Sequence, residues 1–212
     1  DISFENGSAG SESVVSATQT LSNSVVYSNE KLGYLKIPQN EHVELEITDY
    51  DFQDQITVSF WANGDAGILP VNTSVIEAAD SLNNRILNVH FPWSNSENYW
   101  DAGEGSGYDR INKAATAGEI GGEWHHWAFT KNSTSGVMNI YKDGVLWHTG
   151  SGLTRDVGIV NTFKLGANRN QGNGWPGKVD EFRVWDTELA ASEILTWMNQ
   201  KVTAAHPIYS DL

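Results

Sequence analysis

Residues 137–148 read VMNIYKDGVLWH, and this stretch decides the class of fold. Asp143 and Gly144 lie between two arms of alternating side chains, and glycine supplies the positive φ that a two-residue type I′ turn requires. The turn places Ile140 opposite Trp147 and Tyr141 opposite Leu146, so both faces of the predicted β-hairpin carry apolar side chains. We therefore expect the hairpin to lie inside a two-sheet sandwich rather than at a solvated sheet edge.

The same period-two alternation recurs along the chain and predicts a β-rich protein. Nine Trp, seven Tyr and seven Phe accompany twenty Gly and only five Pro. A chain of 212 residues has a size that one all-β sandwich commonly reaches. We predict one domain over residues 1–200, a two-sheet antiparallel jelly-roll sandwich, followed by a tail or linker at 201–212. The further strand candidates, each bounded by Gly, Asn or Asp, are residues 56–61, 85–91, 124–130, 163–166 and 179–185.

One short helix is predicted near the C-terminus. Leu189 and Ile194 have the spacing of a hydrophobic staple around an N-cap at Ala190, and Glu193 occupies the third helical position. Ile194, Trp197 and Met198 would form the apolar stripe of this helix.

The composition excludes several functional classes. The formal net charge is −14, from 13 Lys and Arg against 27 Asp and Glu, so the basic face that nucleic-acid binding needs is absent. No cysteine is present, which excludes disulfides, thiolate metal sites and cysteine nucleophiles. No apolar run approaches the ~18 residues of a membrane span, so we expect no membrane insertion. We interpret the start at Asp1 as that of a mature or excised domain, in which the missing signal peptide says nothing about export.

Four ordered blocks in the second half of the chain resemble the laminin-G-like group of concanavalin A-like jelly rolls, a superfamily related to the pentraxins. The blocks are residues 122–130, 138–144, 163–166 and 175–185. The resemblance implies two antiparallel sheets, one of them concave. It also implies a non-catalytic glycan-binding or adhesion module, secreted or at the cell surface, with neighbouring domains in a larger polypeptide. The fold alone does not decide between a polysaccharide or glycan ligand and a protein partner.

A calcium ion is expected where such modules bring their first and last strands together. Calcium takes six to eight oxygen ligands, and Glu5, Asp180 and carbonyl groups near Gly7 would supply several of them. The alternative is that Glu5 caps or solvates the terminal strand and that Asp180 pairs with Arg183 or Lys178.

Residues 92–122 are interpreted as a long loop, and loops of this length in a compact domain are usually functional or mobile. Sugars stack their C–H faces on aromatic rings, and their hydroxyl groups bind amides, carboxylates and guanidinium groups. The alternative is that the tryptophans are core residues and that residues 108–110 hold a buried ion pair. Acidic polymers would need a local basic site, for which Arg110 and Arg169 are the candidates. The predicted ligand-binding residues are Trp93, Asn98, Tyr99, Trp100, Asp101, Tyr108, Asp109, Arg110, Asn173 and Trp175.

A polysaccharide lyase or glycoside hydrolase is the remaining alternative. A hydrolase needs two carboxylates in one cleft, and the nearest candidates are residues 44–46 and 49–51, without the expected third carboxylate or flanking aromatics. A lyase would need Tyr108 and Arg110 together with His90 and His126. His125 and His126 point to opposite faces of a strand, so they do not bind one metal from one face.

Overall fold

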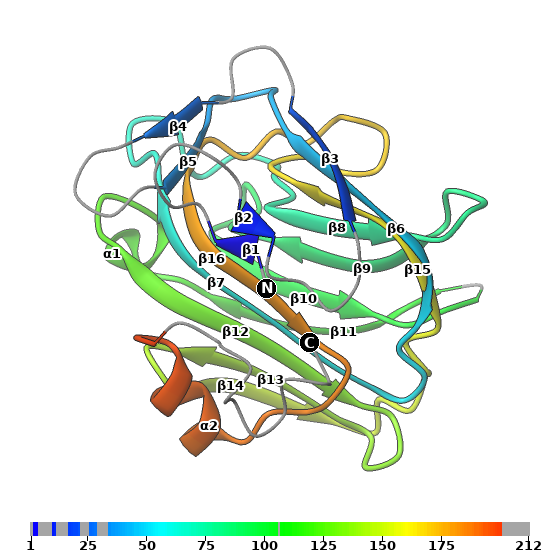
Figure 1. Ribbon diagram of the computed structural model, residues 1–212. Coiled ribbons are helices and arrows are strands. Elements are labelled where there is room, and N and C mark those ends of the chain that lie inside the picture. Colours follow the sequence, from blue (N-terminus) through cyan, green and yellow to red (C-terminus); the bar gives the residue numbers. More distant parts are fainter. Residues whose placement is uncertain are drawn as a thin grey trace.

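The computed structural model describes residues 2–3, 10–11, 17–21, 26–28, 34–105 and 107–200. In these residues the chain forms two antiparallel β-sheets that pack face to face (Figure 1). The prediction of a two-sheet jelly-roll sandwich is confirmed. The predicted tail at 201–212 lies outside the described residues.

The nine-stranded sheet contains the predicted hairpin at one edge. Its order is β14-β13-β12-β7-β16-β1-β2, while β5 pairs with β16 and β4 pairs with β5. Its strands are β1 (Ile2–Ser3), β2 (Gly10–Ser11), β4 (Val26–Ser28), β5 (Tyr34–Ile37), β7 (Gln55–Gly64), β12 (His125–Asn132), β13 (Val137–Lys142), β14 (Val145–Ser151) and β16 (Gly177–Trp185).

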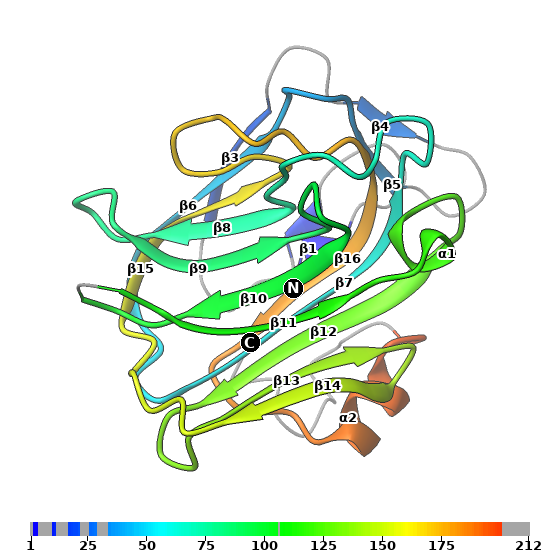
Figure 2. The same cartoon turned by 180° about the vertical axis from the view of Figure 1, so that it is seen from behind.

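The seven-stranded sheet faces the viewer in Figure 2 and has the order β11-β10-β9-β8-β15-β6-β3. The prediction of a long loop at residues 92–122 is wrong. Two strands of this sheet, β10 and β11, and the short helix α1 (Ala117–Ile120) lie in that range. In β10 polar residues alternate with Trp100 and Ala102, which face the core. The composition of this strand therefore resembles that of a loop. The strands are β3 (Ala17–Leu21), β6 (Val43–Asp51), β8 (Ile76–Ala79), β9 (Arg85–His90), β10 (Glu97–Ala102), β11 (Asp109–Ala114) and β15 (Ile159–Leu165).

Aromatic rings fill the space between the sheets. Phe129 stacks on Phe60 at a centroid distance of 5.7 Å, and Trp100 of the opposite sheet lies 5.7 Å from Phe129. Phe91 packs edge-on against Trp127 at 4.9 Å. Aromatic pairs add about 0.5–1.5 kcal/mol beyond the burial of their area, so these contacts help to fix how the two sheets pack.

The hairpin turn forms as predicted, with φ of 51° at Asp143 and 76° at Gly144. The predicted register is confirmed for Tyr141, which pairs with Leu146. It is wrong for Ile140, because a β-bulge between these two residues pairs Ile140 with His148 instead of Trp147. The hairpin also does not lie inside the sandwich. β14 is an edge strand, and its Val145 is 68% exposed.

The predicted C-terminal helix is α2 (Ala191–Trp197), with Ala190 as its N-cap. The backbone N–H of Ala190 donates to Oε2 of Glu193 at 2.7 Å, and Leu189 and Ile194 are buried as a staple predicts. These two residues join Ala128, Tyr141 and Trp185 in a second core on the outer side of the nine-stranded sheet (Figure 1). No helix in the described part of the chain has the length and apolar composition needed to cross a bilayer.

The chain that follows α2 is held against the outer side of the nine-stranded sheet by buried donors. Arg183 donates to the carbonyl groups of Trp197 and Gln200, both at 2.7 Å. The indole of Trp61 donates to the carbonyl of Met198 at 2.8 Å. The ring of His126 is buried on the same side of the sheet, where it packs edge-on against Trp61 with ring centroids 5.5 Å apart.

The first prediction separates backbone strain from steric overlap in the hairpin. A Cβ at Gly144 would lie 2.7 Å from Cδ1 of Leu195, whereas a Cβ at Gly152, where φ is also positive, meets no atom within 4 Å. Gly152→Ala should therefore cost only the left-handed strain of about 1–2 kcal/mol, and Gly144→Ala should cost more. Chemical denaturation measures both values. Equal losses would contradict the predicted clash with Leu195.

The second prediction concerns His126. Burial, and then the charge of Arg183, lower the pKa of His126 to about 3 from the usual 6.5. Below pH 6.5 the unfolded chain therefore binds a proton that the folded chain excludes, and stability falls as the pH falls toward 3. Between pH 6.5 and pH 5 this residue should lower the free energy of unfolding by about 2 kcal/mol. His126→Phe should flatten the pH dependence of urea unfolding, whereas the control His125→Phe should leave that contribution in place.

Candidate functional site

The outer face of the seven-stranded sheet carries a row of polar side chains that crosses six strands. Strand alternation directs one set of side chains to the core and the next set outward, so directly opposed residues share a face. Leu87 and Val89 face the core, and Asn88 between them faces outward. We call this set the polar row; in the order of the strands it consists of Glu44, Lys164, Glu77, Asn88, Asp101 and Arg110.

Glu77 is a buried carboxylate of the polar row, with 1% of the residue exposed. Arg169 donates to its Oε1 at 2.6 Å, and Arg85 lies 3.1 Å from its Oε2. Asn88 donates its side-chain amide to the same Oε2 at 2.6 Å. A buried charge is stable only when it is paired and hydrogen-bonded, and these three partners meet both conditions.

Asp101 forms the second buried centre and is 0% exposed. Arg110 binds it in a bidentate manner, with Nε–Oδ1 of 2.5 Å and Nη2–Oδ2 of 2.6 Å, and this hydrogen bonding raises the pKa of Arg110. Arg85 reaches Oδ2 of Asp101 at 3.4 Å. Arg85 thus connects Asp101 to Glu77, and the two centres form one ionic network.

Aromatic rings surround the Asp101 end of the row. The guanidinium of Arg110 lies 4.8 Å from the ring centroid of Tyr99 and 4.9 Å from that of Tyr108. Trp93 packs on His90 with ring centroids 4.5 Å apart. Tyr108 is exposed, and Trp93 and Tyr99 are partly exposed, so this end offers flat apolar surfaces beside fixed polar groups.

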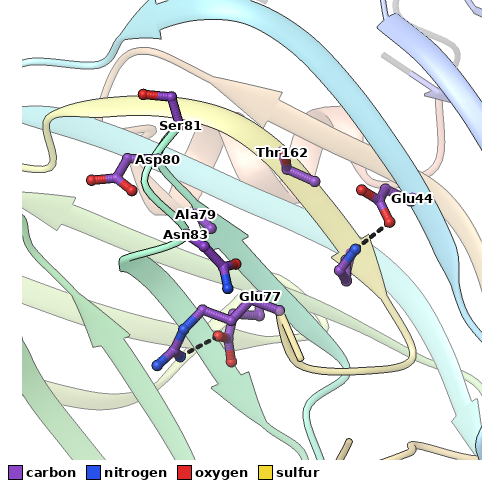
Figure 3. A pocket seen from close by; sticks show the side chains of 9 residues that line it. Glu44, Glu77, Ala79, Asp80, Ser81, Asn83 and Thr162 are labelled. Atoms are coloured by element: carbon purple, nitrogen blue, oxygen red, sulfur yellow. Dashed lines mark hydrogen bonds and ion pairs between the residues drawn. The ribbon is translucent and has the colours of Figure 1, made fainter. Parts of the chain in front are cut away.

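A pocket of about 180 Å³ lies at the other end of the row, at Glu77 and Glu44 (Figure 3). Lys164 forms an ion pair with Glu44 across the sheet. The β8–β9 turn supplies Asp80, Ser81 and Asn83, and Thr162 comes from β15. The full lining is Glu44, Glu77, Ala79, Asp80, Ser81, Asn83, Thr162, Lys164 and Arg169.

Five of the predicted ligand-binding residues gather on this outer face. They are Trp93, Tyr99, Asp101, Tyr108 and Arg110. They contact one another and His90 through the ion pair, the cation–π contacts and the ring contacts given above. Their part in ligand binding remains a prediction.

Three other predicted residues lie in the interior, because they occupy the core-facing positions or pack beneath the sheet. Trp100 is 1% exposed and donates its indole N–H to the carbonyl of Thr130 at 3.0 Å, so it is a core residue and not a platform. Trp175 is 0% exposed and packs toward Phe91. Asn98 is equally buried.

The last two predicted ligand residues have structural contacts. Asp109 accepts a hydrogen bond from the buried ammonium of Lys131 at 2.8 Å, so the ion pair at this position joins Asp109 to Lys131, whereas Arg110 pairs with Asp101. Asn173 has a positive φ of 53°, and its carbonyl accepts the N–H of Ser74 at 2.7 Å.

The calcium site remains a prediction. Glu5 and Gly7 lie outside the described residues. Asp180 is half-buried in β16, where its Oδ1 accepts the N–H of Glu181 at 2.9 Å. Across the described ranges no group of three or more His, Asp or Glu residues is placed to hold a metal ion.

The residues proposed for catalysis do not form one constellation. Glu44 lines the pocket but is paired with Lys164. His126 lies under α2 on the nine-stranded sheet, whereas Tyr108 and Arg110 belong to the outer face of the other sheet, so the lyase arrangement does not form. His90 is buried, with its Nδ1 2.6 Å from the carbonyl of Thr73, and burial lowers its pKa.

Sequence reasoning missed Glu77, Arg85 and Lys164 as members of the site. A signal existed for Glu77, which interrupts the apolar run of residues 75–79 and therefore needs a cationic partner if that strand is buried. The sequence does not identify the partner, because Arg169 is 92 residues away.

Comparison with known proteins agrees with the two-sheet fold. A laminin-G-type family model, described as the concanavalin A-like lectin/glucanases superfamily, matches residues 37–195. No curated protein sequence matches the chain.

Solved structures with similar folds include three toxin binding domains. The binding domain of botulinum neurotoxin serotype G has a TM-score of 0.73 at 16% identity, over 92% of this chain and 49% of its own. The serotype D ligand-binding domain in complex with N-acetylneuraminic acid has a TM-score of 0.75 at 14% identity, over 92% and 48%. The binding domain of Paraclostridial mosquitocidal protein 1 has a TM-score of 0.71 at 14% identity, over 93% and 51%. The chain therefore spans about half of the length of these structures.

The third prediction distinguishes core tryptophans from surface ones. Trp100→Ala and Trp175→Ala should each cost about 3–5 kcal/mol of unfolding free energy, because both side chains are enclosed. Trp93→Ala should cost clearly less, because this side chain is partly exposed. Thermal and urea unfolding measure all three. A small loss for Trp100→Ala would contradict its assignment to the core.

Proposed function

The chain belongs to the concanavalin A-like lectin/glucanases superfamily, and from this premise we propose that it is a non-catalytic carbohydrate-binding module of a larger extracellular protein. The observation that carries the proposal is the outer face of the seven-stranded sheet. It combines partly exposed aromatic rings, a pocket and a polar row whose buried charges are already neutralised.

Such a face suits a sugar for physical reasons. The groups that would contact hydroxyls are held before binding, since Asp101 is fixed by Arg110 and Glu77 by Arg85 and Arg169. A preordered surface loses less conformational freedom when a ligand binds. Tyr99 and Tyr108 offer ring faces against which the C–H groups of a pyranose pack.

The same ion pairs argue against catalysis at this face. A glycosidase needs one carboxylic acid free to protonate the leaving group and one carboxylate free to act as base or nucleophile. Glu77 already accepts hydrogen bonds from Arg169 and Asn88 and forms an ion pair with Arg85, and Asp101 is held by a bidentate Arg110. Neither carboxylate is available for proton transfer without breaking its network.

The structural neighbours support a binding role in general terms. The similar toxin structures are binding domains, and one of them holds N-acetylneuraminic acid. Their low identity shows the fold alone, so the sugar bound here is not inferred from theirs.

A protein-binding adhesion domain is the second candidate, and one observation favours it. Val145 and Leu146 on the edge strand β14, and Leu195 on α2, are exposed apolar side chains on the hairpin side of the nine-stranded sheet. An exposed apolar edge is a common feature of strand-pairing interfaces.

The fourth prediction tests sugar binding at the proposed face. Affinity electrophoresis in gels containing mannan, galactan, xylan or a β-glucan should show retardation with at least one polymer. Tyr108→Ala should weaken that binding roughly twofold to tenfold, the size of one aromatic contact.

Trp124→Ala is the matched control, because Trp124 is an exposed aromatic that packs on Tyr34 and not on the polar row. An equal loss of glycan affinity in both variants would contradict the assignment of the binding site to the polar face. No retardation by any glycan, together with partner binding that depends on Leu146, would favour the adhesion domain.

A further inference from the structure

We propose that the pocket at Glu77 selects uncharged sugar units and that Asp80 is the residue that excludes acidic ones. The inference rests on the proposed function, because it names the ligand class of the same face. It is carried by the distribution of charge around the pocket.

The cations that line the pocket are already neutralised. Lys164 is paired with Glu44, and Arg169 is paired with Glu77 at 2.6 Å. Arg85, behind Glu77, is shared between Glu77 and Asp101. A uronate, sialate or sulfate group would have to displace one of these carboxylates from its partner, and a displaced Glu77 would be left buried and without its cation, which is strongly unfavourable.

Asp80 adds a negative charge that no cation offsets. Its side chain lines the pocket, and it forms no ion pair with any residue in the described part of the chain. Its Oδ1 accepts the backbone N–H groups of Leu82 at 3.0 Å and Asn84 at 2.7 Å, and its Oδ2 accepts the Asn84 amide at 2.8 Å. These three bonds fix the carboxylate at the pocket, so it does not swing away from an approaching anion.

The remaining lining suits hydroxyl groups. Ser81 and Thr162 carry hydroxyls that donate and accept, and Asn83 carries an amide that does both (Figure 3). The volume of about 180 Å³ is below the ~300–1,000 Å³ of pockets for drug-sized ligands, which points to one sugar ring rather than a larger group. The net charge of −14 also repels acidic polymers at long range.

The experiment compares polymers that differ only in charge. Mannan, galactan and a β-glucan are each used unmodified and after oxidation of their primary hydroxyl groups to carboxylates, and affinity is measured by electrophoresis and calorimetry at 20 mM and 300 mM salt. The unmodified polymer should bind more tightly than its oxidised form, and the difference should shrink at high salt because salt screens exposed charges.

Asp80→Asn keeps the side-chain oxygen that the turn needs and removes the charge. It should reduce the preference for the unmodified polymer roughly threefold to fivefold, the size of one exposed charge interaction. Asp65→Asn is the matched control. Like Asp80, Asp65 accepts a backbone N–H two residues ahead, from Gly67 at 2.9 Å, but it is exposed and does not line the pocket.

Each outcome decides a different point. A reduced preference in Asp80→Asn but not in Asp65→Asn supports the inference. An equal change in both variants overturns it, because net charge alone would then explain the selection. Equal or tighter binding of the oxidised polymers overturns the inference and leaves sugar binding intact. Absence of binding to every polymer overturns both proposals.

Discussion

The buried carboxylate of Glu77 sets the conditions that the rest of the outer face must satisfy. An ionised carboxylate enclosed by a sheet is tolerated only with cationic and hydrogen-bonding partners, and Arg85, Arg169 and Asn88 supply them from a neighbouring strand and a distant loop. Arg85 in turn also contacts Asp101, which needs Arg110. The network is therefore coupled: loss of one member leaves another charge buried without its partner.

The two sheets use their outer faces in different ways. On the nine-stranded sheet, α2 and the chain after it cover an apolar patch that includes Tyr141 and Trp185. On the seven-stranded sheet, charged and aromatic side chains occupy the outer face instead, and a pocket opens among them. One face thus contributes to stability by burying apolar area, while the other keeps polar groups ordered at a surface where a ligand can reach them.

Local features of the sequence predicted local structure well. The Asp143-Gly144 turn and the staple between Leu189 and Ile194 depend on residues close in sequence, and both form as predicted. The predicted register holds from the turn to Tyr141 and fails at Ile140, because a bulge that no turn residue specifies admits Trp147 as an extra residue, which packs on Trp127.

The candidate site was harder to predict, because its contacts join distant parts of the chain. Asn98 and Trp100 lie in the same strand as Tyr99 and Asp101, yet only the latter pair faces outward. A composition rich in Asn, Asp and aromatics does not distinguish such a strand from a loop. The pairing of Glu77 with Arg169 depends on how two segments meet in space, and nothing in either segment specifies it.

Three hydrogen bonds that hold the end of α2 and the residues after it end on backbone carbonyl groups, those of Trp197, Met198 and Gln200. These three bonds therefore do not depend on which side chains stand at the accepting positions. The residues that follow α2, up to Gln200, lie on the side of the sandwich opposite the polar row. A support or fluorophore coupled at the exposed Asn199 would leave the polar face directed into solution, which makes this position suitable for immobilised binding sensors.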